Sequence, residues 1–211
     1  MLLALTDHLR CTAAHEDSWL VARADAVETG RMVEGIVGCP VCHAERVVTG
    51  GVLYWEGTPG AVPPDPAPDA GAERVMRLGA LLGFTEGAAP FVLRGADGLA
   101  ASGLIGLAEV PLVLLDPPDD RAAPFATIIR GAPGIPFGAG AVRGIAAGGR
   151  LGNDPGFAAS CVRALAPRGR LVAAASAPLP AGIRELARDG LEWVGEREPV
   201  PVTVPLSRAR R

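Results

Sequence analysis

From about residue 72 onward, short apolar runs alternate with segments of helical periodicity. Val75, Leu78, Leu81 and Leu82 recur at helical spacing within 72–84. Further helices are predicted at 99–110, 155–167 and 180–190. Buried strands are predicted at 89–95, 110–116, 125–131, 141–148 and 169–176, and two closing strands at 191–198 and 201–206.

This alternation of strands and helices predicts βαβ units and a mostly parallel, Rossmann-like sheet. The runs are apolar throughout rather than alternating with polar residues, as expected for strands whose two faces are both covered. We therefore expect helices on both faces of the sheet, and the closing strands as an antiparallel hairpin at one edge.

The first quarter of the chain has a different pattern. Residues 1–56 hold three of the four Cys and all three His, and "ERVVTGGVLYW" (45–55) predicts a hairpin that turns at Gly50-Gly51. Residues 57–71, "GTPGAVPPDPAPDAG", are rich in Pro, Gly and Asp, which indicates a linker. The predicted organisation is a β-rich module over 1–56, a linker over 57–71, an α/β domain over 72–205 and a basic tail over 206–211.

Composition narrows the range of functions. The chain has 211 residues, 49% of them apolar, and a net charge of −3, so a nucleic-acid-binding face is not expected. All 20 basic residues are Arg, which excludes lysine Schiff-base chemistry. No apolar segment reaches the roughly 18 residues of a membrane span, and no leader pattern precedes Asp7, so we expect a cytoplasmic protein.

Two pairs of metal-binding side chains lie about two dozen residues apart. Cys11 and His15 are separated by three residues, and Cys39 and Cys42 form a Cys-x-x-Cys turn. Thiolate and imidazole ligands in this number suit structural zinc, which would stabilise a module with a thin core. A redox pair at Cys39 and Cys42, or simply buried thiols, are the alternatives.

The stretch "LTDHLRC…GCPVCHAERVVTGGVLYW" resembles the short zinc-ribbon proteins that bind and activate methyltransferases, and the ribbons fused to the front of some bacterial methyltransferases. The usual Cys-Pro-x-Cys first knuckle is replaced here by Cys11-Thr-Ala-Ala-His15. The resemblance implies a zinc ribbon and a protein partner or self-association.

The remainder is similar to class I methyltransferases that use S-adenosylmethionine (SAM). The similarity is carried by "VPLVLLD" (110–116), "IIRGAPGIPFGAGAVRGIAAG" (128–148) and "CVRALAPRGRLVAAAS" (161–176). It implies a cofactor pocket at Gly95, Asp97, Gly98 and Asp116, with Asp116 gripping the ribose hydroxyls.

The chain departs from that family at the acidic positions. Arg94 lies where an acid would end the first strand, and Ala132 stands where the acid that contacts adenine would follow Gly131. Losing several hydrogen bonds to charged groups, each contributing about 1.5–3 kcal/mol, would weaken SAM binding by orders of magnitude. We therefore expect a non-catalytic methyltransferase-like protein with a structural or partner-binding role. The alternative is an active SAM-dependent methyltransferase with an unusual pocket.

Overall fold

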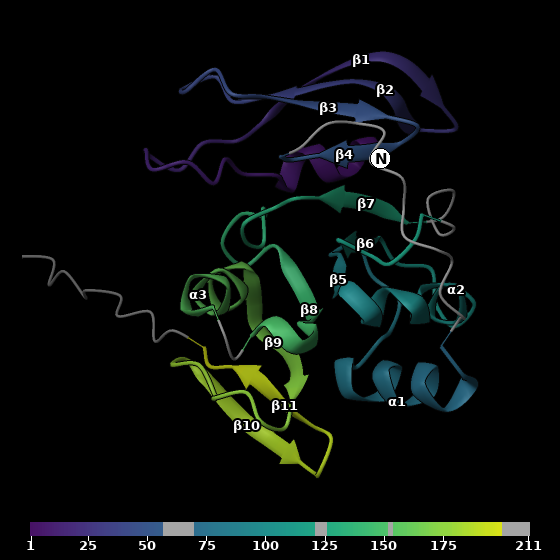
Figure 1. The fold of residues 1–211 in the computed structure, drawn as a ribbon, viewed down its shortest axis with the longest axis vertical. Helices are drawn as coiled ribbons and strands as arrows, with labels where there is room; N and C mark the ends of the chain where they lie inside the picture. Colours follow the sequence, from purple (N-terminus) through teal and green to yellow (C-terminus); the bar gives the residue numbers. More distant parts are fainter. Residues whose placement is uncertain (57–69, 121–125, 152–153, 200–211) are drawn as a thin grey trace, which may run out of the picture.

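A computed structural model describes residues 1–56, 70–120, 126–151 and 154–199 of the chain. Eleven strands in these residues form one mixed sheet, in the order β1-β2-β3-β4-β7-β6-β5-β8-β9-β11-β10 (Figure 1). The strands are β1 (Val21–Glu28), β2 (Arg31–Gly38), β3 (Glu45–Thr49), β4 (Val52–Tyr54), β5 (Phe91–Arg94), β6 (Leu112–Leu115), β7 (Thr127–Arg130), β8 (Val142–Ala146), β9 (Leu165–Ala174), β10 (Ile183–Arg188) and β11 (Glu192–Arg197). The helices are α1 (Ala72–Leu82), α2 (Ala101–Ile105) and α3 (Pro155–Ala164), with short 3-10 turns η1 (Leu3–His8), η2 (Gly95–Ala100) and η3 (Gly148–Arg150).

The middle of the sheet is parallel, as predicted. Strands β4, β7, β6, β5, β8 and β9 are joined by parallel pairings, and Val92 on β5 lies opposite Val113 on β6. The five remaining pairings are antiparallel, so the expectation of a mostly parallel sheet is corrected to a mixed one. The antiparallel strands lie at both ends of the sheet, because the N-terminal segment and the closing hairpin extend it there.

The N-terminal segment does not stand apart from the rest of the sheet. Strands β1 to β4 form an antiparallel meander, and the predicted turn at Gly50-Gly51 joins β3 to β4 with φ values of 58° and 78°. Strand β4 then pairs in parallel with β7, which places Val52 opposite Ile128. This backbone pairing attaches the first quarter of the chain directly to the parallel strands.

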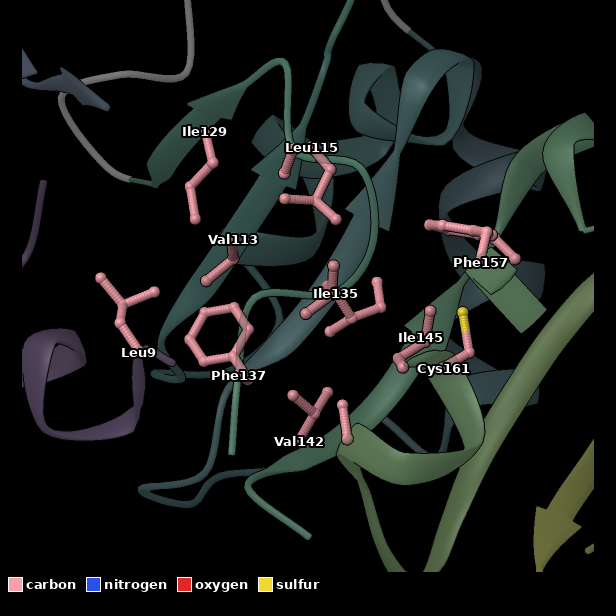
Figure 2. Packing of buried hydrophobic residues seen from close by; sticks show 14 of the residues in the cluster. Leu9, Val113, Leu115, Ile129, Ile135, Phe137, Val142, Ile145, Phe157 and Cys161 are labelled. Atoms are coloured by element: carbon pink, nitrogen blue, oxygen red, sulfur yellow. The ribbon is translucent and has the colours of Figure 1, made fainter. Parts of the chain in front are cut away.

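Helices cover both faces of the sheet, as predicted. Helices α1 and α2 pack on the face to which Leu112 and Leu114 point, and α3 packs on the opposite face, with Val113 and Leu115 (Figure 1). On the α3 face, η1 and the loop after β7 take the place of further helices. Figure 2 shows Ile135 and Phe137 from that loop beside the strand residues, and both side chains are fully buried.

Two sequence predictions near the C-terminal end of the domain need correction or stay open. Residues 180–190 are not a helix: strand β10 covers Ile183–Arg188 and pairs antiparallel with β11. The closing hairpin therefore consists of β10 and β11, and the predicted strand 201–206 lies outside the described residues.

The predicted helix at 99–110 is shorter, since η2 and α2 together end at Ile105.

The predicted linker is described only at Ala70 and Gly71, and the predicted tail 206–211 is outside the described residues. The domain boundaries at these segments thus stay predictions. Among the described residues, no helix combines the length and the apolar character needed to cross a membrane.

Candidate metal centre and carboxyl-end crevice

The four predicted metal ligands come together. One ligand atom from each of Cys11, His15, Cys39 and Cys42 lies within 4.8 Å of all the others. The bend after Cys11 supplies the first pair, and the turn between β2 and β3 supplies the second. All four cysteines of the described chain are free thiols, so Cys39 and Cys42 form no disulfide.

The separations of the ligand atoms suit tetrahedral zinc. With Zn–S bonds of about 2.3 Å and Zn–N bonds of about 2.05 Å, a tetrahedral site has S···S edges of about 3.8 Å and S···N edges of about 3.6 Å. The Sγ atoms of Cys11 and Cys42 are 3.7 Å apart, and His15 Nε2 is 3.4 Å from Cys39 Sγ. The cluster can therefore hold zinc with all four positions filled by this chain.

His15 is oriented by its own loop. Its Nδ1 lies 2.6 Å from the carbonyl oxygen of Glu16, a distance that suits donation of the Nδ1 proton to that oxygen. With the proton on Nδ1, the lone pair of Nε2 is directed at the cluster. Such a hydrogen bond from the second ring nitrogen is a usual feature of histidines that bind metal.

The backbone around Cys39 favours its thiolate. Burial raises the pKa of the Cys39 thiol, but hydrogen bonds from the backbone of Cys42 and Val41 and from neighbouring thiols outweigh burial and lower this pKa to about 6. For Cys11, burial also raises the pKa, and hydrogen bonds from the Ala13 backbone and the His15 side chain lower it overall. The Cys39 thiolate, the form that binds zinc, is thus favoured near neutral pH.

A buried arginine lies against the cluster. Zinc with three thiolates and one neutral imidazole would carry a net charge of −1. Arg46 Nη2 lies 3.8 Å from Cys11 Sγ, and its guanidinium stacks 4.1 Å from the centre of the Trp55 ring. Arg46 is 7% exposed, so its positive charge would act on the centre with little screening by water.

The metal cluster lies at a defined edge of the sheet. Strand β2 runs parallel to β4, because both are antiparallel to β3, and β4 runs parallel to β7. The Cys39–Cys42 turn after β2 is therefore at the edge where the parallel strands end. Ligands of open α/β sheets bind beyond this edge, where the order of the strands reverses.

In this chain the order reverses between β5 and β8, and a cavity of about 350 Å³ opens there. Of the four predicted cofactor residues, Gly95 and Asp97 line this cavity. Gly98 lies against Pro117, since a Cβ added to it would be 3.2 Å from Pro117 Cβ. Asp116 follows β6 and is not part of the cavity lining.

The carboxylate of Asp116 is engaged within the chain. Its Oδ2 lies 3.4 Å from Nη2 of Arg94, and its Oδ1 accepts a hydrogen bond of 2.7 Å from the backbone N–H of Gly131. Ala132, which stands where the resemblance to methyltransferases places the acid that contacts adenine, is buried. The strand end where the sequence predicts ribose binding therefore carries an internal ion pair.

Asp97 is engaged in the same way. Its Oδ1 forms a 2.7 Å ion pair with Arg74, and its Oδ2 accepts a hydrogen bond from Gly148 N–H at 3.2 Å. Arg74 also contacts Glu192, which in turn pairs with Arg77. The Glu192 side chain is only 8% exposed, so this network closes one side of the cavity with paired charges.

Sequence reasoning missed Arg74 and Glu192, which also line the cavity. They are 118 residues apart, on α1 and β11, and no local pattern connects them. Cys161 is a buried thiol: burial raises its pKa to about 12, so the thiol stays neutral.

The network at Glu192 should contribute to stability. Glu192→Gln keeps the side-chain shape but removes the charge that faces Arg74 and Arg77, and we expect a loss of about 2 kcal/mol in unfolding free energy. Urea denaturation measures this loss. In the matched variant Glu196→Gln, on the same strand, the lost partner Arg184 is 61% exposed, so the loss should stay below about 1 kcal/mol. Equal losses in both variants would contradict this account of the network.

No protein-family model and no curated protein matches the chain. Solved structures that are similar to it include a provisionally assigned sarcosine dimethylglycine methyltransferase from Galdieria sulphuraria (21% identity, 48% of this chain and 44% of that one, TM-score 0.39). Another is a geranyl diphosphate C-methyltransferase from Streptomyces coelicolor A3(2) (16%, 48% and 42%, TM-score 0.40). A third is a provisionally assigned SAM-dependent methyltransferase from Methanococcus maripaludis (11%, 61% and 85%, TM-score 0.47).

The chain spans less than half the length of the Galdieria and Streptomyces proteins. Its fold class is therefore assigned from its own strand order and parallel pairings: an α/β fold with a large mixed sheet.

Proposed function

We propose that the chain is a non-catalytic methyltransferase-like protein that binds a structural zinc ion and acts as a structural or partner-binding subunit. One observation carries this proposal: the acids expected to bind the cofactor, Asp97 and Asp116, are each paired with an arginine of the same chain. Each carboxylate also accepts a backbone hydrogen bond.

These pairings oppose the binding of SAM. A ribose at Asp116 would have to displace Arg94 or the N–H of Gly131, and would leave the displaced group without its charged partner. Arg94 would also face a cofactor that carries a sulfonium and an ammonium group, and like charges at short range repel. Ala132 offers no carboxylate to the adenine amine.

The zinc ion has a structural role in this proposal. Since the chain fills all four positions, no site is left open for a water or a substrate. Bound zinc would tie the loop that carries Cys11 and His15 to the end of β2. Arg10 directly precedes Cys11 and donates its backbone N–H to the carbonyl oxygen of Pro136. Bound metal would therefore also help to hold the segment after β7 in position.

The alternative function is a SAM-dependent methyltransferase with an unusual pocket. The cavity of about 350 Å³ at the point of strand reversal favours it, because cofactors of this fold bind there. Methyl transfer can proceed mainly by aligning donor and acceptor, so this alternative needs no general base.

Crystals grown with excess S-adenosylhomocysteine distinguish the two functions. We expect the Arg94–Asp116 and Arg74–Asp97 pairs to be present, with no nucleoside ordered between β5 and β6. A nucleoside ordered against Asp116, with Arg94 turned away, would overturn the proposal in favour of the methyltransferase.

A further inference from the structure

Strand β1 forms one end of the eleven-stranded sheet. Among the described residues its only strand neighbour is β2, so the backbone on its other side faces no strand. Figure 1 shows β1 at the outer end of the N-terminal meander. An eight-residue edge strand of this kind is a template for pairing with another chain unless its sequence opposes it.

The sequence of β1 is complementary to itself. Its residue types are arranged about Ala24 so that Arg23 precedes it and Asp25 follows it. An alanine and then a valine lie beyond on each side: Val21-Ala22-Arg23-Ala24-Asp25-Ala26-Val27. If two copies paired antiparallel with Ala24 opposite Ala24, Arg23 would face Asp25 and Val21 would face Val27, twice each. Opposite charges and β-branched pairs directly across from each other stabilise antiparallel strands.

The structure places these side chains on one accessible face. Arg23 Nε lies 3.4 Å from Asp25 Oδ1, so the two side chains share a face. Val21 and Val27 are 62% and 50% exposed, whereas Ala22 packs against the core on the other face. The register shifts between β1 and β2 fall between Ala24 and Val27 and are local, because the pairings on the two sides of them are in the same register.

We propose that β1 is a self-association surface, which pairs antiparallel with β1 of a second copy about a two-fold axis at Ala24. The sheets of the two copies would then join into one, and the exposed valines would be covered at a symmetric interface. A second copy is the partner that fits, because the charge order Arg-x-Asp complements itself in this register. The inference is independent of the proposed function.

The other edge strand, β10, lacks this property. Centred on Leu186, antiparallel self-pairing of β10 would place Arg184 opposite Arg188, so like charges would face each other. Strand β10 therefore provides the matched control surface.

The test is sedimentation equilibrium of the full chain as a function of concentration. We expect a dimer of twice the 21.5 kDa chain mass. Arg23→Asp places two aspartates opposite each other at two symmetric points, and should raise the dissociation constant by roughly tenfold or more. The double variant Arg23→Asp/Asp25→Arg exchanges the charges, restores both pairs and should recover the original dissociation constant.

Two controls keep the outcomes distinct. Arg184→Ala on β10 creates no complementary charge pair across that edge and should leave the dissociation constant unchanged, and circular dichroism should show that every variant is folded. A chain that stays monomeric at all concentrations would overturn the proposal. So would a dimer that is insensitive to Arg23→Asp, or one that the double exchange does not restore, because another surface would then hold the two copies together.

Discussion

Removal of zinc is expected to lower the melting temperature of the protein by about 10 °C or more. Ligand binding to the folded state adds directly to its stability, and a structural zinc that contributes a few kcal/mol shifts the midpoint of a chain this size by about 2–4 °C per kcal/mol. The loss should be greatest over β1 to β4, whose loops carry the four ligands. Calorimetry with and without a chelator measures the shift.

Metal analysis with two cysteine variants provides the control. The purified protein should contain about one zinc per chain. Cys39→Ser should lose the metal and show the lower melting temperature without a chelator. Cys161→Ala removes a buried thiol outside the cluster and should keep the metal content unchanged. A native protein without metal, or one whose melting temperature ignores the chelator, would contradict the assignment of a zinc centre.

The metal cluster could be predicted because its pattern is local. Cys39 and Cys42 occupy one turn, Cys11 and His15 one bend, and thiolate and imidazole ligands have few other uses in such a pattern. The run 110–116 predicted a buried strand for a related reason: β6 is covered on both faces, so every residue from Leu112 to Leu115 is apolar.

Other features could not be foreseen, or were wrongly predicted, because they depend on pairing between distant segments. The pairing of β4 with β7 uses backbone groups, which have no sequence signature. The error at 180–190 arose because Ile183 and Leu186 also fit helical spacing, although the following Asp189-Gly190 is a common hairpin turn. Asp189 Oδ1 accepts the backbone N–H groups of Leu191 and Glu192 and so fixes that turn.

The predicted cofactor residues show that tertiary contacts can give a residue another role than its position in the sequence predicts. The position of Asp116 at the end of a buried strand favours ribose binding, and no neighbouring residue in the sequence predicts an ion pair for it. Arg94 lies 22 residues earlier, and only the parallel pairing of β5 with β6 brings its guanidinium to that carboxylate. A carboxylate whose position favours cofactor binding can thus form an internal ion pair instead.

SAM is expected to bind more weakly than roughly 1 mM, which corresponds to about −4 kcal/mol. The ligand would have to separate Arg94 from Asp116, enter a crevice that already holds the positive charges of Arg94 and Arg74, and bind without an acid at Ala132. Each lost or replaced contact to a charged group costs about 1.5–3 kcal/mol, so two or three of them suffice to remove micromolar affinity.

A calorimetric titration of the zinc-loaded protein with SAM and with S-adenosylhomocysteine measures this affinity directly. We expect no saturable heat below millimolar ligand, for the wild-type protein and for Asp116→Ala alike. Saturable binding in the micromolar range that disappears in Asp116→Ala would contradict this expectation, and would identify Asp116 as a cofactor ligand and the protein as one that binds SAM.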